Sequence, residues 1–183
     1  TTKEKVVGGI IFFDLKESKT DAGKTIDDTL ITNIKFYRDN SLTAIADNQV
    51  VGFSSKGEQQ WSFNFEGKAI QTANTDSDQI IAVALSDQKG EAFVKKDSIV
   101  QMINRDGKKI GEYIVDGEVK FLDVEDDLVA LNKKRDIIVI NAKGHEIGKA
   151  TSSRDIKDLI LFQNKREILM VSRNVADILE LKK

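Results

Sequence analysis

Cysteine and proline are both absent from the 183 residues of this chain. The absence of cysteine excludes disulfides, thiolate metal sites and a cysteine nucleophile. The absence of proline leaves the turns to glycine, asparagine, aspartate and lysine. A long apolar run is missing as well. The longest, residues 6–15, contains two glycines and an aspartate and is shorter than the roughly 20 residues that a membrane-spanning helix requires. We therefore expect no direct membrane insertion by this segment.

The chain also lacks a large net charge of either sign. The chain has 28 Lys and Arg residues against 30 Asp and Glu residues, which gives a formal net charge of −2. Binding to nucleic acid or to anionic lipid depends on a basic surface. We therefore predict no nucleic-acid partner, and the charged residues are expected to form a solvated surface.

What the chain does contain is short apolar runs rich in β-branched residues, such as residues 79–85 and 136–141. Polar turn candidates, including Asp106-Gly107 and Lys143-Gly144, separate these runs. Runs of this length and spacing are typical of strands, and no helical periodicity competes with them. The sequence therefore predicts an all-β fold.

Three of the predicted turns share one pattern, at residues 53–57, 103–107 and 140–144. Each has an apolar residue, then Ser or Asn, any residue, Lys or Asp, and finally glycine. Glycine accepts the positive φ angle that such a hairpin turn requires. After the turn, residues two apart fall on one face of a strand. These are Trp61, Phe63 and Phe65 in one copy and Gly111, Tyr113 and Val115 in another.

The runs before these turns repeat too, which divides the chain into four units of four short strands each. One such antiparallel sheet cannot bury both of its faces, whereas sheets stacked around an axis can. We therefore predict a single propeller-like domain over residues 1–183, with about four four-stranded antiparallel blades. An insertion, residues 86–98, would protrude between the second and third strands of the second unit. The units are approximately residues 34–68, 69–117, 118–154 and 155–183.

The fourth unit lacks its last strand, while an apolar segment, residues 6–15, precedes the first unit. We expect this N-terminal strand to complete the last blade and close the ring, since a paired edge resists aggregation. Residues 16–29 would then form a polar connecting loop. Two alternatives stay open: the units are a fragment of a larger ring, or two chains complete one another.

Residues 54–63, which include Gly57 and Trp61, resemble the repeat of pyrroloquinoline-quinone-type propellers, in which tryptophan follows a glycine by four residues. The other copies have Gly111 and Gly148 at the tryptophan position, so the tryptophan-docking ring of that family is not reproduced. Residues 34–183 instead resemble degenerate pyrroloquinoline-quinone-like or WD40-like propellers of bacterial envelopes, including uncharacterised families tethered by one N-terminal membrane helix. This resemblance implies a non-enzymatic, extracytoplasmic protein.

Candidate site residues are few. Trp61 is expected to pack within a blade, because an aromatic ring buries a large apolar area there. His145 is the only histidine and lies on a predicted surface turn, without the partners that a metal site or a catalytic triad needs. The acidic loops at residues 74–78 and 123–127 do not match a calcium loop and are expected to form plain turns. We therefore predict no catalytic, cofactor-binding or metal-binding residue.

The insertion is the one departure from the repeat. Phe93, Val94, Lys95 and Lys96 interrupt its polar stretch, and loops that depart from a repeat often carry binding function. These four residues are the candidate partner-binding residues. The alternative is a simple hairpin extension that folds back on its own sheet.

The expected function is a non-catalytic protein-interaction or scaffold module without a cofactor, which binds another protein or a cell-wall component. Because the sequence begins at Thr1 and not at methionine, the chain is expected to be an extracytoplasmic part of a membrane-anchored bacterial protein; a cytoplasmic location stays open. It would be a monomer or a homodimer. One alternative is a ligand sensor or enzyme that uses a central channel, and another is a structural half-ring that dimerises.

Overall fold

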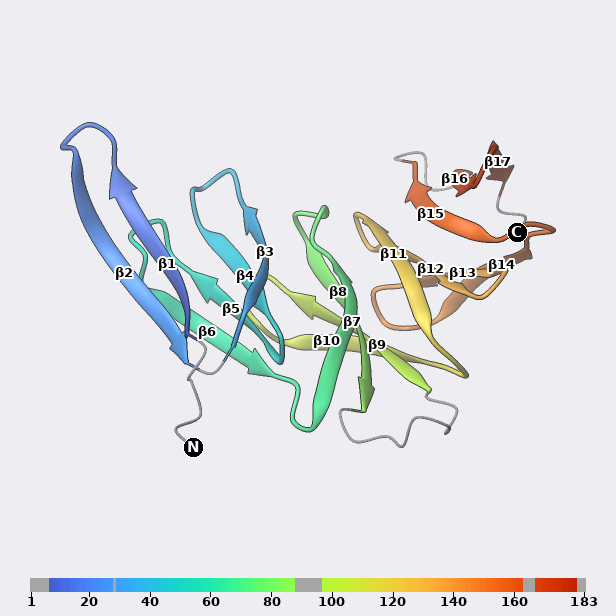
Figure 1. Cartoon of the computed structure of the whole chain (residues 1–183), viewed down its shortest axis with the longest axis horizontal. Coiled ribbons are helices and arrows are strands. Elements are labelled where there is room, and N and C mark those ends of the chain that lie inside the picture. Colours follow the sequence, from blue (N-terminus) through green and yellow to red (C-terminus); the bar gives the residue numbers. More distant parts are fainter. Residues whose placement is uncertain (1–6, 28, 88–96, 163–166, 181–183) are drawn as a thin grey trace. The chain divides into compact units, whose positions relative to one another are not determined.

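The computed structural model describes residues 7–27, 29–87, 97–162 and 167–180. Every helix or strand in these residues is a β-strand, so the all-β prediction is confirmed. Accordingly, no helix in the described part is long and apolar enough to cross a membrane. The chain divides into two compact units, Thr1–Glu66 and Gly67–Lys183. The single domain over residues 1–183 stays a prediction, and each unit is described by itself (Figure 1).

The first unit contains a two-stranded hairpin and a four-stranded antiparallel sheet. The hairpin packs its inner apolar side chains on the second and third strands of the sheet, and Phe12 and Phe53 lie 6.1 Å apart between ring centroids. The strands are β1 (Val7–Asp14) and β2 (Lys19–Asp27) in the hairpin, and β3 (Ile31–Phe36), β4 (Leu42–Ala46), β5 (Gln49–Phe53) and β6 (Gln59–Asn64) in the sheet.

The hairpin corrects the expected loop at residues 16–29. Lys19–Asp27 is a strand that pairs with Val7–Asp14, so the N-terminal strand has a partner in the adjacent segment. That residues 6–15 complete the last blade stays a prediction. The turn between the two strands is short, and Ser18 adopts the positive φ of 50° that reverses the chain. Closing so short a loop costs less entropy than recruiting a strand from the far end of the sequence.

The second unit contains three antiparallel sheets, two with four strands and one with three in the described residues. Within each sheet the strands pair in the order of the sequence (Figure 1). They are β7 (Lys68–Asn74), β8 (Ile80–Asp87), β9 (Ser98–Asn104) and β10 (Lys109–Val115); β11 (Val119–Glu125), β12 (Leu128–Lys133), β13 (Asp136–Asn141) and β14 (Glu146–Thr151); and β15 (Ile156–Leu161), β16 (Glu167–Ser172) and β17 (Ala176–Glu180).

The sheets of the second unit stack face to face, with the first strand of each, β7, β11 and β15, next to one another. One apolar core lies between the sheets β7–β10 and β11–β14, and another between β11–β14 and β15–β17. The second strands β8 and β12 are covered on both faces, which explains their continuous apolar runs. This repeated stacking of four-stranded sheets confirms the propeller-like prediction.

The three glycine turns predicted from the repeat are built alike. In the first, the Gly57 N–H donates to the Ser54 carbonyl at 3.0 Å, and in the third the Gly144 N–H donates to the Asn141 carbonyl at 2.8 Å. The glycines have φ angles of 77° and 83°. Gly107 repeats this geometry with a φ of 75° and donates to the Asn104 carbonyl at 3.0 Å. Each position therefore requires glycine for the same conformational reason.

Trp61 and its counterpart Gly111 pack against different parts of the structure. Trp61 pairs with Gly52 on the neighbouring strand, and a Cβ at Gly52 would come within 2.7 Å of Cζ2 of its ring. The tryptophan therefore lies across a glycine within its own sheet. At Gly111 a Cβ would lie 2.6 Å from the backbone carbon of Lys143, so a tryptophan has no room there. Here the glycine lets the next sheet approach.

Candidate functional site

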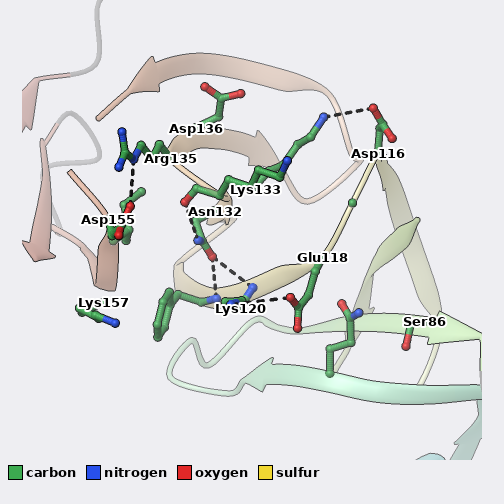
Figure 2. Close-up of a pocket in the computed structure, with 15 residues that line it drawn as sticks. Ser86, Asp116, Glu118, Lys120, Asn132, Lys133, Arg135, Asp136, Asp155 and Lys157 are labelled. Carbon is green, nitrogen blue, oxygen red and sulfur yellow. Dashed lines mark hydrogen bonds and ion pairs between the residues drawn. The ribbon is translucent and has the colours of Figure 1, made fainter. Parts of the chain in front are cut away.

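An open groove of about 1500 Å³ lies at one end of the sheets of the second unit. Its walls come from the connections that lead into β11 and β15 and from the turn between β12 and β13 (Figure 2). The lining is rich in charged side chains. The lining residues are Gln71, Ser86, Asp116, Gly117, Glu118, Lys120, Phe121, Asn132, Lys133, Lys134, Arg135, Asp136, Asp155, Ile156 and Lys157.

The floor of the groove is shaped by a bulge in β11 that Asn132 stabilises. The pairing of β11 with β12 is interrupted between Val119 and Leu122, which leaves two backbone N–H groups without strand partners. The Asn132 Oδ1 atom accepts both of them, at 3.2 Å from Lys120 N and 2.8 Å from Phe121 N. Asn132 is only 1% exposed, so it replaces the missing strand pairing with side-chain hydrogen bonds.

Ion pairs across the groove are few and exposed. Arg135 Nε lies 2.9 Å from Asp155 Oδ1, and Lys133 Nζ lies 3.4 Å from Asp116 Oδ2. Figure 2 shows both pairs bridging neighbouring connections. Exposed pairs of this kind contribute little to stability. A bound molecule can therefore replace one partner of such a pair with little loss of free energy.

Further positive charge stands at the rim. Lys120 pairs only loosely with Glu118, at 3.8 Å. Lys134 and Lys157 make no ion pair within the described part of the chain, and both are exposed. Together with Lys133 and Arg135, five cationic side chains line the groove against four carboxylates. The groove therefore presents positively charged side chains to a ligand.

On the wall of the groove, hydrogen bonding holds Asp136 as an anion. The Thr151 hydroxyl donates to its Oδ1 atom at 2.7 Å, and Lys149 lies 3.5 Å from Oδ2. The Thr151 hydrogen bond, with the charge of Lys149, lowers the pKa of Asp136. This carboxylate is therefore suited to electrostatic contact and not to proton transfer near neutral pH.

Hydroxyl and imidazole groups are sparse in the lining of the groove. Ser86 supplies a hydroxyl, and the lining contains no histidine. His145 lies in the exposed turn at the far end of β13, where its backbone N–H donates to Asn141 Oδ1 at 3.0 Å, as its sequence position predicts. Within the described residues no group of three metal-ligating side chains gathers.

The opposite end of the same sheets carries the two acidic loops, which form turns tied together by hydrogen bonds. The Asn74 Oδ1 atom accepts from the Asp76 N–H at 2.9 Å, and Asn74 Nδ2 donates to Asp123 Oδ1 at 3.0 Å. Asp123 Oδ2 accepts from the Leu161 N–H at 2.6 Å. Asp123 therefore links the first strands of three successive sheets.

Burial of the Asp123 carboxyl raises its pKa. The hydrogen bond from the Leu161 N–H lowers this pKa, and the negative charges of Asp76 and Asp158 raise it by a smaller amount. The folded protein therefore binds this proton more tightly than the unfolded chain. The stability contributed by the protonated carboxyl is fully present below the unfolded pKa of 3.8 and is lost as the pH rises through the folded pKa.

We expect this loss to disappear in an Asp123→Asn variant. The amide does not titrate, so any cost that it adds is the same at every pH. Urea unfolding of both proteins between about pH 4 and pH 7 should show the stability of the native protein falling relative to the variant. If the free energies of unfolding of the two proteins changed in parallel with pH over this range, the raised pKa of Asp123 would be contradicted.

The candidate partner-binding residues Phe93, Val94, Lys95 and Lys96 lie outside the described residues, and their role stays a prediction. The strands that flank them are β8, which ends at Asp87, and β9, which begins at Ser98.

Ser98 fixes the second of these flanks beside the groove. Its buried hydroxyl donates to the Gly117 carbonyl at 2.7 Å and lies 2.8 Å from Gln71 Oε1. Gln71, Gly117 and Ser86 all line the groove. Both flanks of the insertion are therefore anchored at the groove.

Sequence reasoning did not identify the groove. A signal was present in Lys133-Lys134-Arg135-Asp136, four consecutive charged residues in a tight turn. A charged turn is usually only a solvated surface, and the carboxylates that face it come from connections elsewhere in the sequence. The packing of three sheets is what brings them together.

This architecture is propeller-like, and solved structures share it. The C-terminal WD40 domain of Sif2 superposes on it with a TM-score of 0.72 at 14% sequence identity, covering 98% of this chain and 55% of that one. This chain thus spans about half of that chain. A protein of unknown function from Bacteroides caccae superposes with a TM-score of 0.52 at 11% identity, covering 94% of this chain and 68% of the other. These similarities show the fold.

By sequence, the chain belongs to the family described as Family of unknown function (DUF5711), which matches residues 1–181. No curated protein matches the chain.

Proposed function

We propose that this chain is a non-catalytic protein-interaction or scaffold module that binds its partner through the groove of the second unit. The observation that carries the proposal is the composition of that groove. It is open and walled by connections of three sheets, and its lining presents many charged side chains, with one serine and no histidine. Such a surface provides recognition by charge and shape.

The partner segment that fits this groove is acidic. Lys134 and Lys157 carry exposed charges without ion pairs in the described residues, and the pairs of Lys120 and Lys133 are long. Carboxylates of a partner can therefore bind these cations without breaking strong contacts. The half-buried Phe121 beside them offers an apolar contact. We infer a partner segment that combines acidic residues with at least one apolar side chain.

The test is co-purification of the native protein with its partners, comparing the wild type with a Lys134→Glu/Lys157→Glu variant. Reversal of both charges should reduce recovery of a true partner at least about tenfold, because like charges then face the acidic segment. The effect should weaken in high salt.

A matched control is the Lys56→Glu/Lys108→Glu variant, which makes the same charge change in two exposed glycine turns. It should retain the partner. Equal loss of the partner in both variants, or none in either, would refute binding through the groove.

The extracytoplasmic, membrane-anchored location is part of this proposal, and the resemblance to envelope propellers supports it. The same co-purification addresses location, because an anchored protein and its partner should be recovered from the membrane fraction of intact cells and should be cleaved by externally added protease. Recovery only from the protected soluble fraction would place the protein in the cytoplasm.

A further inference from the structure

The outer face of the last sheet exposes a row of apolar side chains. Ile160 on β15, Leu169 on β16 and Ile178 on β17 are directly opposite one another across the three strands. Ile160 is 43% exposed and Ile178 is 61% exposed, while Leu169 is half-buried. We call these three residues the terminal face. An exposed apolar row on a sheet is typical of a surface that packs against a partner.

The preceding sheet shows what such a row normally contacts. Its equivalent residues, Asp123, Ala130 and Val139, are also directly opposite one another. Ala130 and Val139 are both 0% exposed, because the last sheet covers them with one apolar core. The terminal face therefore repeats the row that forms an established sheet-to-sheet interface, with larger apolar side chains in place of alanine and valine, and two of its three side chains are exposed.

A second uncovered apolar face lies on the hairpin β1–β2. Its inner residues Ile10 and Phe12 pack on the first sheet, whereas the outward Ile11 and Phe13 are 73% and 54% exposed. Ile11 is opposite Gly23, around which a Cβ would meet nothing within 4 Å. The hairpin therefore presents a flat apolar face that a sheet can approach closely.

Charge at the two faces is complementary. Glu167 and Glu180 are directly opposite each other at the end of the terminal face, and like charges in that position repel. The turn of the hairpin places the exposed Lys16 next to Leu15, which is 85% exposed. A hairpin laid on the terminal face can bring this positive charge to the two glutamates.

We propose that the hairpin of a second copy of this chain covers the terminal face. The Sif2 domain on which 98% of the chain superposes is longer, and this chain covers only 55% of it, so an assembly of that size holds nearly two copies of these sheets. Each copy gives one hairpin and receives one, which is the reciprocal arrangement of a two-fold dimer. The inference does not depend on the groove.

The experiment is sedimentation equilibrium of the purified chain over micromolar concentrations, with Ile11→Lys and Ile178→Lys as separate variants. The wild type should be a dimer. A lysine at the centre of an apolar contact should raise the dissociation constant of each variant by at least about 30-fold. A mixture of the two variants should form a dimer more tightly than either variant alone, because one contact in the mixed pair then joins two unchanged faces.

Ile114→Lys and Ile147→Lys are the controls, since these exposed isoleucines lie on the fourth strands β10 and β14 and belong to neither face. They should leave the dimer unchanged, and circular dichroism should show all variants to be folded. A wild type that stays monomeric would overturn the proposal, including the case in which the chain covers the face with its own hairpin. So would a dimer that both variants leave intact, or a mixture no tighter than its components.

Discussion

Replacing Gly144 with alanine is expected to destabilise the second unit strongly. Gly144 has a φ of +83°, and an added Cβ would overlap the Glu112 carbonyl, at 2.8 Å from its carbon. The backbone conformation costs a non-glycine residue about 1–2 kcal/mol, and overpacking adds about 1–3 kcal/mol. Urea unfolding followed by circular dichroism should therefore show a loss of about 2–5 kcal/mol.

The control separates these two costs. Gly67 has a φ of +69°, but a Cβ there would meet nothing within 4 Å. Gly67→Ala should lose only the conformational part, about 1–2 kcal/mol. If both variants lost the same stability, then the close approach of the Gly144 turn to β10 would contribute nothing, and sheet-to-sheet contact through this turn would be disproved.

Replacing Asn132 with leucine is expected to have the second large effect. The substitution preserves shape but leaves the N–H groups of Lys120 and Phe121 without their acceptor. It also removes the 3.2 Å hydrogen bond from Asn132 Nδ2 to the Lys134 carbonyl. Each buried backbone group left unsatisfied costs about 1–3 kcal/mol. The groove should admit water to part of this site, so we expect a loss of about 2–4 kcal/mol in urea unfolding.

Asn132→Asp is the matched variant, because a carboxylate can still accept both N–H groups while losing the donor to Lys134. It should lose less stability than Asn132→Leu at neutral pH, and it should retain partner binding better, since the bulge that carries Lys120 is preserved. Wild-type stability in the leucine variant would show that Asn132 does not stabilise the bulge.

The parts of the fold that sequence reasoning identified are those specified by neighbouring residues. The turns at Gly57 and Gly144 were predictable because a polar residue followed three positions later by glycine encodes both the hydrogen bonds and the φ angle locally. The strands β8 and β12 were equally plain, because burial on both faces leaves a continuous apolar run.

The strand β2 was missed because one of its faces is exposed and polar. Of its described side chains only Ile26 is buried, and Thr20, Lys24 and Thr25 have the composition of a loop. Its identity as a strand depends on the apolar β1 beside it. Strand pairing of this kind is decided by a neighbour and not by the segment itself.

By itself, the sequence determined the all-β class, the four-strand repeat and its glycine turns, because these follow from period-two patterning and local turn chemistry. Only the tertiary structure decided the groove, the link of Asp123 to β7 and β15, and the exposure of the terminal face. These features join residues such as Asp116 and Arg135 from different connections, and their proximity exists only after the sheets have stacked. A local pattern specifies a strand and its turn, whereas the packing of one sheet on the next decides which side chains meet.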